Sequence, residues 1–166
     1  FVVLGLDESQ DMYLALASTV RSSIQVSRDS CVPCNKFKSS PGLQLVSVAS
    51  ALLSMTILDD FVSHQKVIFH NAPEPLAFAA QAYAKAKSID IVFTTNAVDL
   101  LPSVESAIPW FHLPTFQSQS EIRHLIPQEV DGYFDFTQNA STECLPILLN
   151  LPSHARIETA KNLFSS

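Results

Sequence analysis

The apolar residues of this chain fall into two kinds of segment, short continuous runs and longer stretches with helical spacing. Runs of strand length, bounded by polar or turn-forming residues, predict strands at residues 1–6, 13–17, 23–27, 66–70, 89–95, 110–113 and 133–136, with a last one within 155–164. Apolar positions three or four residues apart predict helices at residues 43–61, 74–87, 121–126 and 142–149.

From residue 43 onward, predicted strands alternate with predicted helices, which is typical of a parallel sheet with right-handed crossovers. The pattern predicts an α/β fold, a Rossmann-like parallel sheet with flanking helices, preceded by a short N-terminal β segment. We expect residues 1–40 to form that segment and residues 41–166 to form the Rossmann-like domain. The apolar face of helix 43–61 is wide, so we expect this helix to be largely buried.

Composition adds information about partners. Hydrophobic residues make up 47% of the chain and charged residues 16%, whereas charged residues usually make up about 25% of a soluble domain. Much of the surface is therefore expected to face other protein. The net charge of -6 argues against nucleic acid, and no apolar run is long enough to span a membrane. The chain starts without Met or a basic leader, so we expect a cytoplasmic segment of a longer polypeptide.

The turn after strand 66–70 is where such a sheet would hold a dinucleotide. A phosphate-binding turn needs glycines for its tight bend and for close approach of the backbone to the phosphates. Here the turn and helix start read Asn71-Ala72-Pro73-Glu74-Pro75-Leu76-Ala77, and the chain's glycines, Gly5, Gly42 and Gly132, all lie elsewhere. Proline lacks an amide donor, and Glu74 adds negative charge. The same residues also suit an ordinary helix start. The sequence therefore predicts a turn that binds no cofactor.

The ribose end of a dinucleotide site needs a carboxylate or a basic group after the second strand of the sheet. Between Lys87 and Arg123 there is no Lys or Arg. Asp99 could in principle meet a ribose hydroxyl there, but without a phosphate site we expect it to bind none.

Cysteines form one close pair, Cys31 and Cys34, while Cys144 stands apart. Zinc needs about four ligands, and no second cluster supplies them. A redox CxxC motif usually opens a helix after a strand, which Pro33 and the polar residues that follow do not favour. We expect reduced cysteines and no metal site.

Other candidate residues have structural interpretations. His70 ends a buried strand and His112 lies on a short one, so both are expected to be hydrogen-bonded structural histidines, and Trp110 is expected to pack in the core. No Ser-His-Asp order or G-x-S-x-G elbow is present.

Several motifs together carry a family resemblance. They are Val67-Ile68-Phe69-His70, the ungapped stretch from Asn71 to Ala80, Ile91-Val92-Phe93-Thr94-Thr95, the stretch from Val130 to Asp135, and Glu143-Cys144-Leu145. With them the chain resembles the enoyl reductase domain of the medium-chain reductase superfamily, as found in polyketide and fatty acid synthases. Trp110-Phe111-His112 and Leu145-Pro146 are similar to fungal highly reducing polyketide synthases, including those fused to a peptide synthetase. The three turn glycines of that family align with Glu74, Pro75 and Ala77 of this chain, so none of them is present here.

The resemblance implies that the domain has lost its chemistry. In this fungal group the region is often degenerate, and a separate enzyme performs the reduction. Active members carry a Lys after the second strand and an Arg-Asp pair after the third, but residues 96–109 hold no Lys and residues 110–119 no Asp or Arg. Phe136-Thr137 stands where the family has Asn-Ser. By the same resemblance, residues 1–40 are the remnant of a substrate-binding half.

The implied function is a non-catalytic structural domain, with no catalytic residues and no cofactor. It would belong to an iterative polyketide synthase, an acyltransferase-class multifunctional enzyme of fungal secondary metabolism, and its partners would be neighbouring domains. Two alternatives stay open. One is an active NADPH-dependent enoyl reductase fragment with an atypical cofactor site, and the other is a docking module for a trans-acting enoyl reductase.

Overall fold

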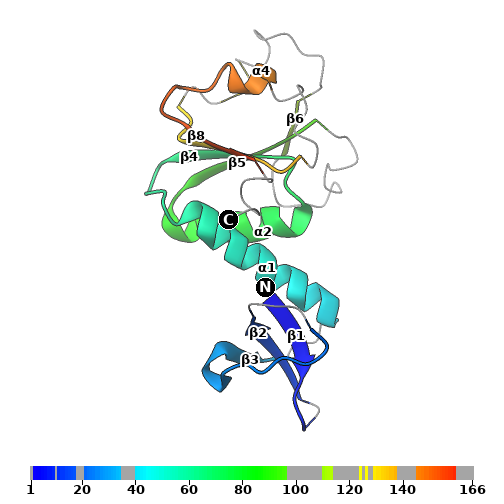
Figure 1. Cartoon of the computed structure of the whole chain (residues 1–166). Coiled ribbons are helices and arrows are strands. Elements are labelled where there is room, and N and C mark those ends of the chain that lie inside the picture. Colours follow the sequence, from blue (N-terminus) through cyan, green and yellow to red (C-terminus); the bar gives the residue numbers. More distant parts are fainter. Residues whose placement is uncertain are drawn as a thin grey trace. The chain divides into compact units, whose positions relative to one another are not determined.

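The computed structural model describes residues 2–9, 11–17, 21–34, 40–96, 110–113, 124, 126, 129–137 and 145–159. The chain divides into two compact units, Phe1–Leu53 and Ser54–Ser166, and each is described by itself (Figure 1). No helix in the described residues is long and apolar enough to cross a membrane.

The first unit contains a three-stranded antiparallel sheet of order β1-β2-β3. Its strands are β1 (Val2–Leu6), β2 (Met12–Leu16) and β3 (Cys31–Pro33), with a short 3-10 helix, η1 (Arg28–Ser30), before β3. The turn from β1 to β2 is closed by Asp7, whose carboxylate Oδ1 accepts hydrogen bonds from the amides of Ser9 and Asp11, both at 2.9 Å. Such a local Asp-to-backbone pattern is a common way to build a polar turn.

The strand predicted at residues 23–27 is wrong, because these residues form a connection without regular structure. Ile24 and Val26 alternate with polar neighbours, which is the pattern of a half-buried strand. The place beside β2 is instead taken by β3, with Leu14 opposite Val32 and Ala15 opposite Cys31. Periodicity detects a local preference, whereas a strand also needs a partner elsewhere in the chain.

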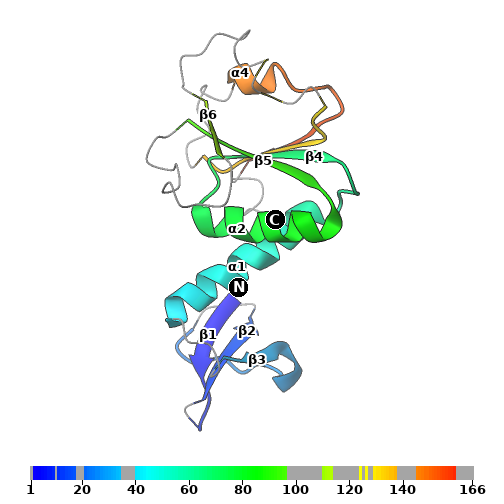
Figure 2. The same ribbon diagram turned by 180° about the vertical axis from the view of Figure 1, so that it is seen from behind.

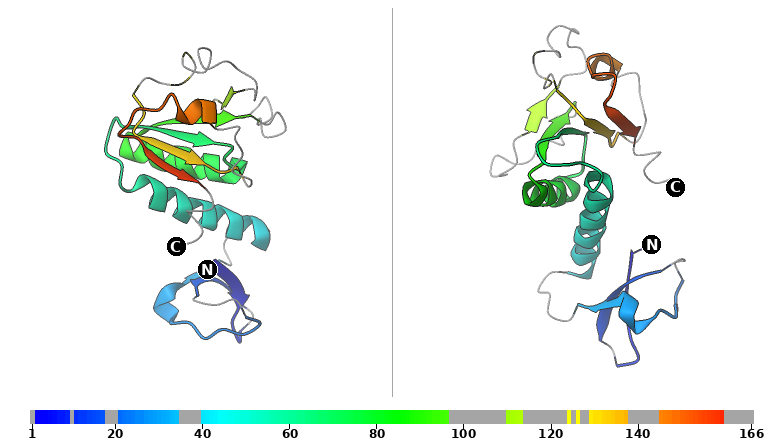
Figure 3. Two further views of the ribbon diagram at one scale, coloured as in Figure 1. Left: turned by 45° about the horizontal axis from the view of Figure 1, so that its top comes forward. Right: turned by 90° about the vertical axis from the view of Figure 1, so that its left-hand side faces the viewer.

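The second unit is built on a five-stranded, wholly parallel sheet of order β6-β5-β4-β7-β8. The strands are β4 (Lys66–His70), β5 (Asp90–Thr95), β6 (Trp110–His112), β7 (Gly132–Asp135) and β8 (Arg156–Thr159). Helices α2 (Glu74–Lys87) and α4 (Leu145–Leu148) lie on opposite faces of this sheet (Figures 1 and 3). This confirms the predicted fold class, a Rossmann-like sheet with flanking helices plus a short N-terminal β segment. Most of predicted helix 121–126 lies outside the described residues, as do residues 142–144 and 160–164.

Each face of the parallel sheet carries its own apolar layer, because successive side chains of a strand point to opposite faces. On the α4 face, Ile68, Tyr133 and Ile147 pack in one cluster with Leu113, Ile126 and Val130. The opposite face is aromatic, and there the ring of Phe69 lies 5.9 Å from Phe93, 5.5 Å from Phe134 and 5.2 Å from Phe136 between ring centres. The continuous apolar pattern of β4 thus reflects burial on both sides.

Helix α2 packs closely because its buried positions are small. Ala77, Ala80 and Ala84 recur at helical spacing and are fully buried. The helix runs along the sheet (Figure 2). The helix ends at Ser88, which adopts a left-handed conformation with φ 57°. Its amide donates to the carbonyl of Lys85 at 3.3 Å, a common way to close a helix.

Helix α1 (Pro41–Leu58) differs from the expectation in both length and burial. The helix stops at Leu58 instead of residue 61. Of its side chains that the structure describes, only Gln44, Ser54, Ile57 and Leu58 are buried, while Leu43, Val46, Leu52 and Met55 are between 38% and 55% exposed. The prediction that this helix is largely buried was wrong, because its apolar residues are distributed around the helix and full burial is confined to isolated positions and the last turn.

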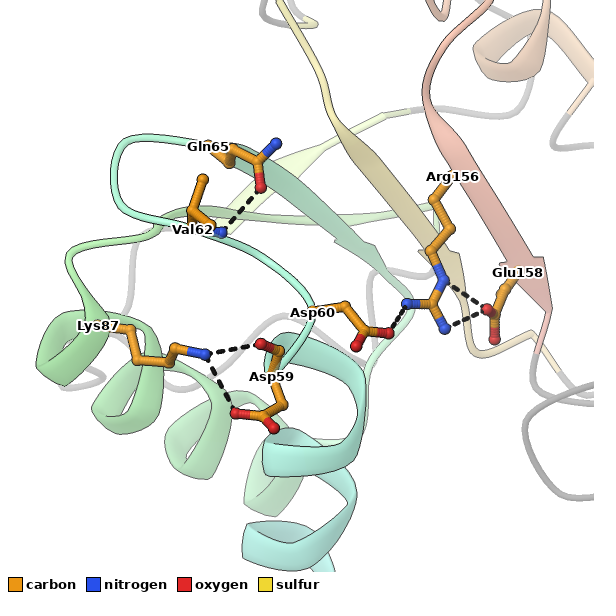
Figure 4. Close-up of polar contacts among 7 residues, drawn as sticks. All are labelled: Asp59, Asp60, Val62, Gln65, Lys87, Arg156 and Glu158. Carbon is orange, nitrogen blue, oxygen red and sulfur yellow. Dashed lines mark hydrogen bonds and ion pairs between the residues drawn. The ribbon is translucent and has the colours of Figure 1, made fainter.

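Ion pairs anchor the end of α1 to the rest of the second unit (Figure 4). The ammonium of Lys87 donates to the backbone carbonyl of Asp59 at 2.8 Å and to its carboxylate at 3.1 Å. The hydrogen bond from Lys87 to the Asp59 carboxylate, together with a second one from the Tyr83 hydroxyl, lowers the pKa of the Asp59 carboxyl below its ordinary value. Arg156 of β8 pairs with Asp60 at 2.7 Å and with Glu158 at 2.6 Å. The turn after α1 is thereby fixed between α2 and β8.

Candidate functional site

The order of the parallel strands identifies where a ligand would bind. From the central strand β4 the chain first builds β5 and β6 on one side, then returns to build β7 and β8 on the other. In open α/β sheets, ligands bind at the carboxyl ends of the strands where the strand order reverses. That point lies at the end of β4, in the turn that leads to α2. We call the space between the carboxyl ends of β4, β5 and β7 the crevice.

The structure places the predicted turn residues, Asn71, Ala72, Pro73, Glu74, Pro75 and Ala77, between β4 and the first turn of α2. Pro73 is the residue that caps α2, and no side-chain hydrogen bond caps this helix. Glu74 and Pro75 are its first two residues. A helix start binds anions through its free amide groups, and proline has none. Two of the donors that would face a phosphate are therefore missing, and the Glu74 carboxylate adds like charge.

The third family glycine position is occupied by Ala77, which is fully buried. Its amide donates to the Pro73 carbonyl at 3.0 Å and so belongs to the first turn of the helix. A glycine there would let helix and strand pack closely, and here a methyl group is accommodated. This substitution alone is compatible with the fold, so the stronger obstacles to a phosphate are the prolines and Glu74.

The side chain of Asn71 spans the crevice. Its Nδ2 donates to Asn96 Oδ1 at 2.9 Å and to Thr137 Oγ1 at 2.8 Å. Its Oδ1 accepts from Thr95 Oγ1 at 2.8 Å and from the Asn96 amide at 3.1 Å. We call these four residues the Asn71 network. Asn71 itself is only 7% exposed, while Asn96 and Thr137 are half-buried, so only part of the network lies in the interior.

Further polar groups beside the network also pair with one another. Asp135 is buried, and its Oδ1 accepts from the amide of Thr137 at 2.8 Å and from its hydroxyl at 2.5 Å. His70 is buried too, with Nδ1 at 2.9 Å from Thr94 Oγ1 and its ring stacked on Tyr133. His70 is therefore the structural, hydrogen-bonded histidine that the sequence predicts. Asp135 and His70 therefore each have a hydrogen-bond partner beside the Asn71 network.

Sequence reasoning located the turn but missed the Asn71 network. The signal for it was present, since polar residues follow three apolar strands at Asn71, Asn96 and Thr137. The carboxyl ends of neighbouring parallel strands lie along one edge of a sheet, so such residues are brought together. Asp99, the candidate ribose ligand, lies outside the described residues.

The remaining candidates lie away from the crevice or outside the described part of the chain. Trp110 is half-buried on β6, with its ring 5.4 Å from that of Phe93. His112 is exposed, so its predicted structural role is wrong, because β6 is an edge strand. Cys144 lies outside the described residues.

Cys31 and Cys34 are both free thiols. They are three positions apart along extended chain, which directs their side chains to opposite faces. The thiol of Cys31 donates to the Ser27 carbonyl at 3.3 Å, and that of Cys34 to the Val32 carbonyl at 3.4 Å. Within the described residues, no group of three or more His, Cys, Asp or Glu side chains is arranged to hold a metal ion. This arrangement fits the structural interpretation of the pair.

Known proteins similar to this chain include polyketide synthases. No family model matches the chain. It is 29% identical over 168 residues to the highly reducing polyketide synthase bet1 of Neocamarosporium betae, and 30% identical over 166 residues to the highly reducing polyketide synthase calA of Penicillium decumbens. Each match covers 99% of this chain, which spans 6% of the length of each relative.

Solved structures agree on the fold. The CurK enoyl reductase superposes with a TM-score of 0.65 at 17% identity, covering 90% of this chain and 46% of that one. The quinone oxidoreductase of Thermus thermophilus superposes with a TM-score of 0.62 at 17% identity, covering 94% of this chain and 52% of that one. The chain thus shares its fold with the CurK enoyl reductase and the Thermus thermophilus quinone oxidoreductase, and it is similar over nearly its whole length to a segment of fungal highly reducing polyketide synthases.

Proposed function

We propose that this region performs no redox chemistry and serves as a structural domain inside an iterative polyketide synthase. The observation that carries the proposal is the state of the crevice. The Asn71 side chain is hydrogen-bonded to residues that follow or end the neighbouring strands, and Pro73, Glu74 and Pro75 occupy the turn where phosphates would be held. Enoyl reduction needs a hydride donor such as NADPH, and a domain that cannot hold one has no source of hydride.

The segment's parent is proposed to be a polyketide synthase, as the names of its relatives suggest. An acyltransferase-class enzyme of the cytoplasm is what the family resemblance adds to this proposal. Its partners would then be the neighbouring domains of the same synthase. The exposed apolar side chains of α1, at Leu43, Val46, Leu52 and Met55, are compatible with contacts to other protein. Docking of a trans-acting enoyl reductase stays open as a second candidate function.

The chain is expected to bind neither NADPH nor NADH with micromolar affinity. The missing amides at Pro73 and Pro75 and the like charge of Glu74 remove the attraction for a diphosphate. Isothermal calorimetry or nicotinamide fluorescence measures this directly. The Thermus thermophilus quinone oxidoreductase, whose structure was determined in complex with NADPH, is the positive control. Micromolar binding by this chain would favour the alternative, an active reductase with an atypical site.

Restoring glycine at Glu74, Pro75 and Ala77 together is expected not to recover enoyl reduction. The Asn71 network would still be in place, and the family's Lys and Arg-Asp groups would still be missing from residues 96–119. The assay is NADPH oxidation with an enoyl thioester, using the CurK enoyl reductase as the active comparison. Turnover of the triple variant well above the unchanged chain would contradict the proposal, since it would mean that the other catalytic parts are present.

A further inference from the structure

A primary carboxamide has two N–H donors and one oxygen that accepts two hydrogen bonds. In Asn71 all of these are used, two donated by Nδ2 and two accepted by Oδ1. Complete pairing of a buried amide is favourable, because each unpaired group would carry its full desolvation cost. Asn71 is therefore held in one orientation by its surroundings.

The partners of Asn71 come from strands that are distant in sequence. Thr95 ends β5 and Asn96 follows it, at 24 and 25 positions from Asn71, while Thr137 follows β7 at 66 positions. Asn71 itself follows β4 directly. One side chain thereby links the carboxyl ends of the three central strands at the point where the strand order reverses.

The backbone of Asn71 adds a second requirement. Its φ is 54°, in the left-handed region, which glycine and asparagine adopt far more readily than other residues. Its amide donates to the Thr94 carbonyl at 2.8 Å. Glycine would meet the backbone requirement but has no side chain, and alanine would meet neither requirement. Asparagine meets both.

We propose that Asn71 is a strap that holds the carboxyl ends of β4, β5 and β7 together, in the space that a dinucleotide would otherwise enter. The inference rests on the proposed loss of the cofactor site. It adds that the domain carries its own substitute for a ligand, so that its stability depends on Asn71 and not on NADPH.

The test compares thermal unfolding of the 166-residue chain with that of three variants. Asn71→Gly keeps the left-handed backbone and removes the strap, and its Tm is expected to fall by about 5–10 °C. Thr137→Val removes an acceptor of Asn71 and also the hydroxyl that donates to Asp135, and it is expected to lower the Tm by about 2–5 °C. Thr137→Ser keeps both hydrogen bonds and should stay within about 2 °C. The Asn96 amide donates to Asn71. Its exchange with solvent should therefore be faster in Asn71→Gly than in the unchanged chain, and the increase should exceed that of the β4 amides.

A Tm of Asn71→Gly within about 2 °C of the unchanged chain would overturn the strap, as would equal behaviour of the two Thr137 variants. If Asn71→Gly fails to fold, Asn71→Asp decides, because it keeps the side-chain oxygen and a residue type that tolerates the left-handed backbone but loses both Nδ2 donors. Its Tm should fall, and an unchanged Tm would overturn the strap. A separate arm adds about 1 mM NADPH to the unchanged chain, where no rise in Tm is expected. A rise would overturn the proposed function, while the variants measured without NADPH still decide whether Asn71 links the strands.

Discussion

Replacing Phe69 by alanine is expected to lower the free energy of unfolding by about 3–5 kcal/mol, the usual cost of removing a buried aromatic side chain. Phe69 lies on the central strand β4 and is fully buried. Its ring contacts those of Phe93, Phe134 and Phe136, so the cavity would open among three other side chains. Urea unfolding followed by circular dichroism measures the loss, with the slope of the transition checking that both forms unfold alike.

The matched control is Phe78→Ala on α2, which removes the same side chain where it is 45% exposed. We expect that change to stay within about 0.5 kcal/mol. If the two variants lose equal stability, the aromatic layer does not form the core. In an intact synthase, Phe69→Ala is also expected to lower soluble yield and product formation while Phe78→Ala does not. A normal product from a synthase whose domain is unfolded would remove the case for a structural role.

Gly132→Ala is expected to lower the free energy of unfolding by about 1–3 kcal/mol, through overpacking. A methyl group at Gly132 would lie 2.5 Å from Cζ of Phe61 and 3.1 Å from Cε2 of Phe134. Neither ring can withdraw easily, because both are buried and they already meet edge-on, 6.0 Å apart. The position therefore requires glycine for space, and chemical denaturation of the variant measures the cost.

Two further variants make this result specific. Gly5→Ala places its methyl group where nothing lies within 4 Å, so it should change stability by no more than about 0.5 kcal/mol. The double variant Gly132→Ala/Phe61→Leu replaces the opposing ring with a smaller side chain. It should recover part of the stability lost in Gly132→Ala, since contacting residues are energetically coupled. Additive effects of the two changes would contradict the predicted clash.

The sequence predicted the parallel sheet well because its strands are buried on both faces. Strand 66–70 was predicted with the bounds that the structure has, and helix 74–87 likewise. In both, local signals agree, since the strand is continuously apolar and the helix begins with Glu74 and Pro75. The turn between them, and hence the position of the crevice, followed directly from these two elements.

What the sequence could not provide was pairing between distant parts of the chain. Residues 23–27 have a strand pattern but no strand pairs with them in the described residues, and β3 takes that place. Helix α1 has the apolar content of a buried helix, yet Leu43 and Met55 are exposed. The Asn71 network joins residues up to 66 positions apart, and no local pattern specifies which strand ends will meet.

The strand order has a consequence for the synthesis of the protein. Because β4 is central and is made first, one of its edges can pair as soon as β5 emerges, but the other waits for β7. Roughly 60 residues separate the end of β4 from β7, so at the usual elongation rate this edge stays open for about 3–12 s. An open apolar strand edge is a template for unwanted pairing. The nascent domain is therefore most prone to aggregate in this interval, before β7 completes the centre of the sheet.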